Sequence, residues 1–493
     1  MSQIRVRFSP SPTGFLHIGS LRTFLYNWLF ARKNKGQMIL RIEDTDRERL
    51  VPQATEKLLE VLENLGFDWD EGPYLEKDKF LISNVKYKGR FGPYIQSQRI
   101  EIYQRFTEEL VKKRKAYYCF CSKERLEKMR KEQEARKMPP CYDGHCRNLS
   151  EKEVESLLVQ EKPKVVRLKI PEGEIEFDDL IRGRVVFELK NIDDQILLKS
   201  DGWPTYHLAN VIDDHLMKIS HVIRGEEWLS SVPKHLLLYK ALGFEAPKFA
   251  HLPLLFNPDL SKLSKREQGA AVEDYLKQGF LQEAIINFVV LLGWNPDTEQ
   301  EIFTLEELIK SFSLEQVQKK GAIVDLNKLL WMNGNYIRKK PLKELIQLCL
   351  PFLIKSNLVK EKEFKFDWLQ RIVVLEQERM KKISDLPLLT KFFFVEKLDY
   401  EPLLLLWKKT SKEEIRENLE KAKEILSKLK DFKLEILKEK LMALVQETGV
   451  GELLWPLRVA LTGEKNSPPP FEIMEILGKE KTLKRIEDAI KKL

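Results

Sequence analysis

The chain has 493 residues and is too long for a single hydrophobic core, so we expect roughly three or four domains. Its net formal charge of +8, from 84 basic and 76 acidic residues, is compatible with a polyanionic partner but does not require one. No apolar run is long enough to cross a membrane, and residues 1–7 lack the apolar core of a signal peptide, so we expect a cytoplasmic protein. Five cysteines at this length do not indicate a disulfide framework.

The N-terminal stretch predicts a strand, a turn and a helix. A β-rich run at residues 4–8 is followed by two prolines and Gly14, which interrupt the strand. Leu21, Leu25 and Leu29 then follow the period of a helix with one apolar face. In a parallel α/β sheet such a turn lies at the carboxyl edge of the strand, where the helix N-terminus attracts phosphate.

His17 and Gly19 lie where this helix is expected to begin. The imidazole can donate to a phosphate oxygen, and a glycine lets a flat base approach the backbone. The alternative is a proline-rich connection that contains an incidental histidine, and the local pattern favours phosphate binding only modestly.

The next elements belong to the same sheet. Residues 37–42 read as a strand whose end brings Glu43 to the same edge as Ser9. Residues 52–66 predict a core helix that ends at a glycine. Residues 76–90 have no clear period and predict an exposed loop.

A cysteine cluster follows near the middle of the chain. Cys119, Cys121, Cys141 and Cys146, with His145, lie close together in a lysine-rich region. In a reducing compartment such a cluster suggests zinc, although these spacings are tighter than those of most structural zinc sites. The alternative is a set of reduced thiols without metal.

The second half of the chain returns to the α/β pattern and then becomes helical. Residues 219–223 predict a strand that ends at Arg224, and residues 226–242 predict a helix. Residues 267–340 are expected to be helical. From residue 341 onward the helical period continues, and no strand pattern is present.

Two short motifs carry a family resemblance. His17-Ile18-Gly19-Ser20 resembles the His-Ile-Gly-His signature of class I aminoacyl-tRNA synthetases, and residues 262–266, Lys-Leu-Ser-Lys-Arg, resemble their Lys-Met-Ser-Lys-Ser loop. Further segments resemble bacterial-type glutamyl-tRNA synthetases, in order along the chain: 41–47, 92–99, 142–144, 201–210, 224–228, 331–334 and 457–463. The helical C-terminal third also resembles this type, since glutaminyl and eukaryotic glutamyl enzymes have β-barrel anticodon domains.

The resemblance implies an α/β fold with a doubly wound, Rossmann-like parallel-sheet catalytic domain, an inserted acceptor-binding domain and an all-helical C-terminal anticodon-binding region. The expected segments are residues 1–99 and 201–266 for the catalytic fold, 100–200 for the insertion, 267–340 for stem contacts and 341–493 for anticodon binding.

The implied reaction joins L-glutamate to tRNA(Glu) through a glutamyl-adenylate, with release of AMP and diphosphate. ATP with Mg²⁺ is a substrate, and one structural Zn²⁺ is a candidate cofactor. We expect a monomer with no membrane partner. The alternative within the family is a non-discriminating enzyme that also charges tRNA(Gln).

The resemblance also implies roles for individual residues. The expected catalytic residues are His17, Lys262 and Lys265. The expected glutamate-binding residues are Arg7, Ser9, Ser11, Glu43, Tyr206, Asn210 and Arg224. The expected ATP-binding residues are His17, Gly19, Glu227, Trp228, Leu255, Lys262 and Lys265. No catalytic role is expected for His207, His215, His221, His235 or His251, which are taken as structural.

Two further sites follow from the resemblance. Zinc-binding family members use a Cys-x-Cys pair and a later Cys-x-His, so the expected ligands are Cys119, Cys121 and Cys146, with His145 or Cys141 as the fourth. Arg379 resembles a family arginine that disfavours guanine at the third anticodon base, and it therefore predicts a discriminating enzyme. The alternative is a solvated arginine in a lysine- and arginine-rich helix.

Two other classes of function compete with this interpretation. An adenylyltransferase with a similar histidine turn would have no use for the C-terminal third. A catalytically inactive RNA-binding paralogue would be expected to lose His17 or Lys265, and both are present.

Overall fold

The computed structural model describes residues 3–76, 85–263, 271–360 and 364–493. The chain forms two compact units, one of residues Met1–Tyr275 and Ile286–Asp325 and the other of Leu276–Ile285 and Leu326–Leu493. Within the described ranges, every helix is too short or too polar to span a bilayer. Lys265 of the predicted basic loop lies outside the described residues.

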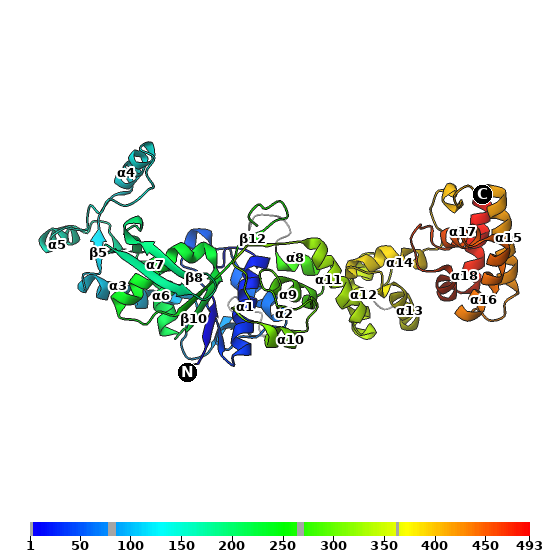
Figure 1. Cartoon of the computed structure of the whole chain (residues 1–493), viewed down its shortest axis with the longest axis horizontal. Helices are drawn as coiled ribbons and strands as arrows, with labels where there is room; N and C mark the ends of the chain where they lie inside the picture. The colour runs from blue at the N-terminus through cyan, green and yellow to red at the C-terminus, as the bar shows by residue number, and fades with distance from the viewer. Residues whose placement is uncertain (1–2, 77–84, 264–270, 361–363) are drawn as a thin grey trace. The chain divides into compact units, whose positions relative to one another are not determined.

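Two parallel strand pairs organise the first unit (Figure 1). Their strands are β1 (Arg5–Phe8), β2 (Gln37–Leu40), β10 (His221–Gly225) and β11 (Lys248–Leu252). β1 pairs with β2 and β10 pairs with β11, each in parallel. The backbone N–H of Ser220 donates to the Arg5 carbonyl at 2.9 Å, so β10 begins alongside β1. The carboxyl ends of these strands therefore meet at one edge, as the sequence predicts.

Helices lie between these strands along the chain. They include α1 (Ile18–Lys33), α2 (Ala54–Asn64), α6 (Tyr206–Leu216) and α7 (Val232–Leu242). Leu21, Leu25 and Leu29 of α1 are fully buried, which confirms the predicted apolar face. The helix predicted at 226–242 begins instead with a 3₁₀ segment, Glu226–Ser231, and α7 follows with Pro233 in its first turn.

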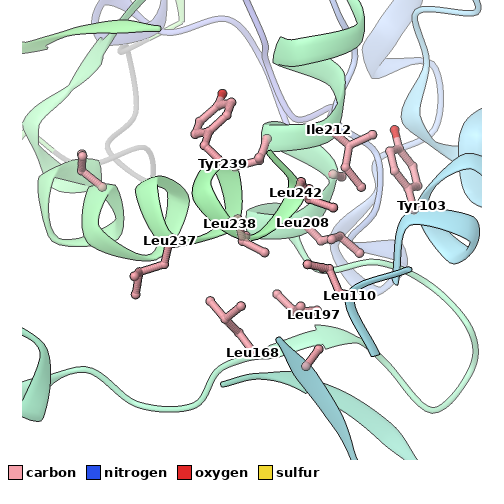
Figure 2. Packing of buried hydrophobic residues seen from close by; sticks show 14 of the residues in the cluster. Tyr103, Leu110, Leu168, Leu197, Leu208, Ile212, Leu237, Leu238, Tyr239 and Leu242 are labelled. Carbon is pink, nitrogen blue, oxygen red and sulfur yellow. The ribbon is translucent and has the colours of Figure 1, made fainter. Parts of the chain in front are cut away.

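Residues 100–200 form helices and strands that share a core with the second half of the sheet domain. Their elements are α3 (Ile100–Lys112), β5 (Ala116–Cys119), α4 (Lys123–Ala135), α5 (Glu151–Val159), β6 (Val165–Leu168), β7 (Glu174–Asp179), β8 (Gly183–Glu188) and β9 (Ile196–Leu198). Figure 2 shows Leu110 of α3, Leu168 of β6 and Leu197 of β9 in one apolar cluster with Leu208 of α6 and Leu238 of α7. β7 pairs with β11 at Asp179 and Phe249, and the insertion thereby extends the sheet.

The prediction of an exposed loop at residues 76–90 is wrong for residues 85–88, which form a strand. β3 (Gly72–Leu75) and β4 (Val85–Lys88) form an antiparallel pair, and residues 77–84 between them lie outside the described part of the chain. Val85-Lys86-Tyr87-Lys88 alternates apolar and basic residues, which is the period of a strand with one face packed. The alternation is only four residues long, too short to stand out among the surrounding lysines.

The segment after the sheet is only partly helical. Its helices are α8 (Val272–Lys277), α9 (Gln282–Val290), α10 (Leu305–Ser311) and α11 (Leu326–Lys339). Residues 291–304 and 312–325 are not helical, and they include β13 (Ala322–Ile323), which forms a short parallel pair with β12 (Leu255–Phe256). The prediction of a helical segment at residues 267–340 is therefore confirmed for α8 to α11 and wrong for these two stretches.

The second unit is helical. Its helices beyond α11 are α12 (Leu342–Lys355), α13 (Phe366–Gln377), α14 (Leu386–Phe394), α15 (Lys412–Lys428), α16 (Leu434–Thr448), α17 (Val450–Thr462) and α18 (Pro470–Lys492). α15, α16 and α17 pack against α18 around a common apolar core. Residues 341–360 and 364–493 contain no strand, which confirms the all-helical prediction.

Candidate active site

A cavity of about 1840 Å³ lies at the carboxyl ends of β1 and β10. All of the expected glutamate- and ATP-binding residues that the structure describes line it: Arg7, Ser9, Ser11, His17, Gly19, Glu43, Tyr206, Asn210, Arg224, Glu227, Trp228, Leu255 and Lys262. These residues are spread over some 250 positions of the sequence. The sheet brings them together because strand ends from both halves of the domain share one edge.

His17 begins helix α1 and lies against Gly19. The His17 Nδ1 accepts a hydrogen bond from the Gly19 backbone N–H at 3.0 Å, so the neutral ring carries its proton on Nε2. A Cβ at position 19 would lie 2.8 Å from His17 Cε1. Gly19 therefore makes room for the histidine ring, and Nε2 is the atom able to donate to a phosphate at this helix N-terminus.

Arg7 and Glu43 belong to a buried ionic network. Asp214 of α6 accepts from Arg7 Nε at 3.1 Å and from Arg41 at 2.7 Å, while Arg41 also donates to Glu43 at 2.9 Å. Burial alone would raise the pKa of Asp214, but Arg7 and Arg41 outweigh it and hold that pKa below its usual value. Burial raises the pKa of Glu43, and Arg41 and Arg7 only partly offset this. The charge of Arg7 is thus already shared with a protein carboxylate.

Asn210 and Ser9 line the same cavity. The Asn210 amide donates to Glu43 at 3.4 Å, which links this side chain to the ionic network. The Ser9 hydroxyl oxygen is buried and has no hydrogen-bond partner among the described residues. A buried hydroxyl without a partner is unfavourable unless a ligand satisfies it.

Arg224 is buried at the end of β10 and is held by uncharged groups. Its Nε donates to His251 Nε2 at 3.1 Å, and its two terminal nitrogens donate to the Tyr206 hydroxyl at 3.1 Å and the Trp228 carbonyl at 3.3 Å. The ion pairs in the described part of the chain do not include Arg224. A buried guanidinium without a carboxylate partner is a strong site for an incoming carboxylate.

Other residues that line the cavity present groups suited to a nucleotide. Trp228 is 36% exposed, and its ring lies 4.3 Å from the Tyr206 ring, centroid to centroid. Leu255 is buried, and Lys262 is exposed beside it on the cavity wall. Apolar and aromatic surface next to ammonium groups is typical of sites that bind a base and its phosphates.

The chain matches known proteins over its whole length. Residues 3–331 match the family of class I tRNA synthetases (E and Q), catalytic domain, and residues 344–490 match an anticodon binding domain family. Over 496 aligned residues the chain is 47% identical to a glutamate–tRNA ligase of Dehalococcoides mccartyi, covering 100% of this chain and 99% of that protein. The chain belongs to the class I glutamate–tRNA ligases.

Other members of this ligase family agree with that assignment. A glutamate–tRNA ligase of Clostridioides difficile is 45% identical, with 98% of each chain covered. A crystal structure of a glutamate–tRNA ligase from Elizabethkingia meningosepticum in complex with its amino acid superposes with a TM-score of 0.89 at 38% identity, covering 100% of both chains. The mixed α/β catalytic domain and the helical C-terminal region inferred from the sequence are therefore confirmed as the fold of this family.

In this family member, three of the predicted zinc ligands form a cluster. The sulfur atoms of Cys119, Cys121 and Cys146 lie within 4.8 Å of one another, and the Cys121 and Cys146 sulfurs are 3.6 Å apart. Sulfur ligands about 2.3 Å from a tetrahedral zinc are separated by roughly this distance. The three thiols fit a zinc ion.

The expected fourth ligand is not in this cluster. Cys141 and His145 are both exposed on the surface. The group that lies among the three sulfurs is instead the Tyr142 hydroxyl, 3.3 Å from Cys119 Sγ and 3.5 Å from Cys121 Sγ. Sulfur and imidazole are the usual zinc ligands, but the side chains of Cys141 and His145 are exposed and lie outside the cluster.

Arg379 makes contacts within the protein. It donates to Glu376 at 2.7 Å and to the Asn466 carbonyl at 3.1 Å, and its side chain remains 29% exposed. Burial raises the pKa of Glu376 to about 7, although Arg379 opposes this shift. Part of the guanidinium is therefore fixed by the protein, while the rest faces solvent.

Several residues at this active site carried no signal in the sequence. Asp214 and His251 contact Arg7 and Arg224, yet neither lies in one of the two short signatures. Their chain positions are 27 to 207 residues from the arginines that they contact. Only the tertiary packing of α6 and β11 brings them to the arginines that line the cavity.

Proposed function

We propose that this chain ligates L-glutamate to tRNA(Glu), using ATP to form a glutamyl-adenylate and then transferring the glutamyl group to the terminal ribose of the tRNA. The observation that carries the proposal is the single cavity lined by the expected amino-acid and nucleotide residues in a chain similar to glutamate–tRNA ligases over its full length. The monomeric state, the cytoplasmic location and the five predicted segments remain predictions.

The amino-acid side of the cavity supports recognition of glutamate. Arg224 would bind the side-chain carboxylate, since it is buried, lines the cavity and has no carboxylate partner among the described residues. Glu43 would hold the α-ammonium, which would also keep Glu43 ionised despite its burial. Arg7 would orient the reacting carboxylate, with Asn210 and Tyr206 fixing the remainder. Ser9 and Ser11 offer hydroxyls on the same wall.

The chemistry needs no protein nucleophile. The glutamate α-carboxylate attacks the α-phosphorus of ATP, the bond to the bridging oxygen breaks, and pyrophosphate leaves. His17 would donate to a phosphate oxygen from the α1 N-terminus, while Lys262 and Lys265 would stabilise charge that develops on the phosphates. Mg²⁺ would be held largely by phosphate oxygens and water.

Basic side chains on the insertion support an approach path for the tRNA acceptor end. Lys123, Lys162, Lys164 and Lys199 line the same cavity. Ammonium groups favour a phosphate backbone without reading its sequence.

An ATP–pyrophosphate exchange assay tests the proposed function. Exchange that depends on glutamate, together with charging of tRNA(Glu), is the expected result. An adenylyltransferase would give no charged tRNA, and an inactive RNA-binding protein would give neither signal. Glutamate-independent exchange, or no charging, would overturn the proposal.

We also propose that one zinc ion binds to Cys119, Cys121, Cys146 and the Tyr142 oxygen, where it would tie the two cysteine loops together. Purified protein prepared without chelator is expected to contain about one zinc per chain. Tyr142→Phe should lower zinc retention in the presence of a chelator, because it removes one of four ligands. Cys141→Ser and His145→Ala are the matched controls and should retain zinc like the parent. Metal analysis that finds no zinc in the parent would favour reduced thiols without metal.

Arg379 supports a discriminating enzyme, with a non-discriminating one as the alternative. Cytosine is the third anticodon base of tRNA(Glu) and guanine that of tRNA(Gln), and the exposed part of a fixed guanidinium suits the smaller base. Arg379→Gln is expected to raise charging of tRNA(Gln) relative to tRNA(Glu) by about tenfold, the effect of one lost base contact. Arg371→Gln, a change at an exposed arginine of α13, is the control. Efficient charging of tRNA(Gln) by the parent would contradict this proposal.

A further inference from the structure

Two buried residues beside the active site have no part in the reaction proposed above. His251 lies on β11 and is fully buried, and Asp179 at the end of β7 is 3% exposed. The Asp179 Oδ2 lies 2.6 Å from His251 Nδ1, and His251 Nε2 lies 3.1 Å from Arg224 Nε. The three side chains therefore form one continuous line of hydrogen bonds that ends at the glutamate side of the cavity.

The hydrogen bonds around Asp179 decide which nitrogen of His251 carries the proton. Asp179 Oδ1 accepts from the backbone N–H groups of Ile181 and Arg182 at 3.0 and 2.9 Å, which leaves Oδ2 to accept from His251 Nδ1. Burial raises the pKa of Asp179, but the His251 contact and these N–H groups outweigh it and keep the carboxylate ionised. His251 is neutral, because burial lowers its pKa more than Asp179 raises it. The proton on Nδ1 leaves a lone pair on Nε2.

That lone pair faces a group that can only donate. Arg224 Nε–H needs an acceptor, and His251 Nε2 provides an uncharged one. His235 Nδ1, 3.4 Å from the Arg224 guanidinium, is uncharged too, because burial and then Arg224 hold the pKa of this histidine well below its usual value. The imidazole of His251 thus separates Asp179 from Arg224, so that the carboxylate orients the arginine without forming an ion pair with it.

We propose that Asp179 and His251 are positioning residues for amino-acid specificity: Asp179 fixes the His251 tautomer, and His251 holds Arg224 in the cavity with its charge left for a second carboxylate of the substrate. This inference rests on the proposed role of Arg224. A direct ion pair between an aspartate and Arg224 would neutralise the site and favour the side-chain amide of glutamine. A guanidinium without such a partner selects the side-chain carboxylate of glutamate. His251 therefore has a function beyond the structural one expected from the sequence.

Asp179→Asn tests the tautomer directly. The two backbone N–H groups require an oxygen at the Oδ1 position, so the new NH₂ group would face His251 Nδ1 and force the ring proton onto Nε2. Two donors, His251 Nε2–H and Arg224 Nε–H, would then oppose each other. We expect the glutamate KM to rise by about tenfold or more, as for loss of a hydrogen bond to a charged group, with the ATP KM unchanged. Asp178→Asn, at an exposed carboxylate one residue away on β7, should behave like the parent.

Substitutions of His251 provide the second arm. A glutamine oxygen can reach the position of Nε2, so His251→Gln should keep most of the activity, whereas His251→Phe offers no acceptor and should resemble Asp179→Asn. The His251→Gln variant has no imidazole ring, so Asp179 has no ring tautomer to fix in it. Adding Asp179→Asn there should change the glutamate KM less than twofold, a coupling that a purely structural carboxylate would not produce.

The outcomes separate this inference from the proposed function. If the parent does not charge glutamate, or Arg224→Gln leaves the glutamate KM unchanged, the proposed function fails. The positioning role is wrong if the parent charges glutamate and Arg224→Gln raises the glutamate KM, but Asp179→Asn leaves the glutamate KM unchanged. It is also wrong if Asp179→Asn changes the glutamate KM equally in the parent and in the His251→Gln variant. Thermal unfolding is followed for every variant, and if Asp179→Asn does not fold, the comparison of His251→Phe with His251→Gln decides the question.

Discussion

Arg224→Gln is expected to lower kcat/KM for glutamate while the ATP KM stays close to that of the parent. The guanidinium is buried and contacts only uncharged acceptors, so the substrate carboxylate would be its main counter-charge. Removing one member of a buried charge pair commonly costs about 2–5 kcal/mol. This corresponds to a fall in kcat/KM of roughly thirtyfold to several thousandfold.

The stability of this variant distinguishes the role of Arg224 in binding from a role in folding. Because Arg224 is a buried cation without an ion-pair partner in the described part of the chain, its replacement by neutral glutamine should leave the unfolding temperature unchanged or raise it. Arg184→Gln on β8 is the control, since that arginine pairs with Glu176 on an exposed surface. An Arg224→Gln protein that loses ATP affinity but retains glutamate affinity would show that Arg224 belongs to the ATP-binding part of the cavity and not to the glutamate-binding part.

Lys265→Ala is expected to slow formation of the adenylate without weakening glutamate binding. An ammonium that contacts the phosphates acts mainly when charge develops there, so its loss should appear in the single-turnover rate. Loss of one such contact commonly costs about 2.7–4 kcal/mol, which is roughly a hundredfold to a thousandfold in rate. Lys262 of the same motif lines the cavity, and Lys262→Ala should change the rate in the same direction.

The control for this prediction is Lys240→Ala, at an exposed lysine of α7. It has the same change of charge but lies on a helix that follows β10 rather than in the basic motif. Single-turnover measurements use saturating glutamate and ATP with tRNA present. A Lys265→Ala rate equal to that of the parent would remove Lys265 from the proposed catalytic residues.

The sequence alone was sufficient for the elements with strong local patterns. Helix α1 and the helical second unit follow from apolar periodicity, because a buried helical face needs an apolar residue every three or four positions. Motif resemblance was sufficient to predict many of the residues that line the cavity. His17, Glu43 and Arg224, for example, lie in short segments at or just after the ends of strands. Weak local patterns gave errors, as at β4, where only four residues alternate.

Only the tertiary structure decided which side chains surround these residues. Tyr142 rather than Cys141 or His145 lies beside the cysteine sulfurs. The fold of the loop buries Tyr142 and leaves Cys141 and His145 exposed to solvent. Likewise His251 reaches Arg224, and Asp179 reaches His251 from the neighbouring strand, at separations in sequence that no local pattern encodes. The sequence determined the chemical groups and the order of the elements. The pairing of the strands determined which of those groups touch, since contacts across a sheet depend on register and not on distance along the chain.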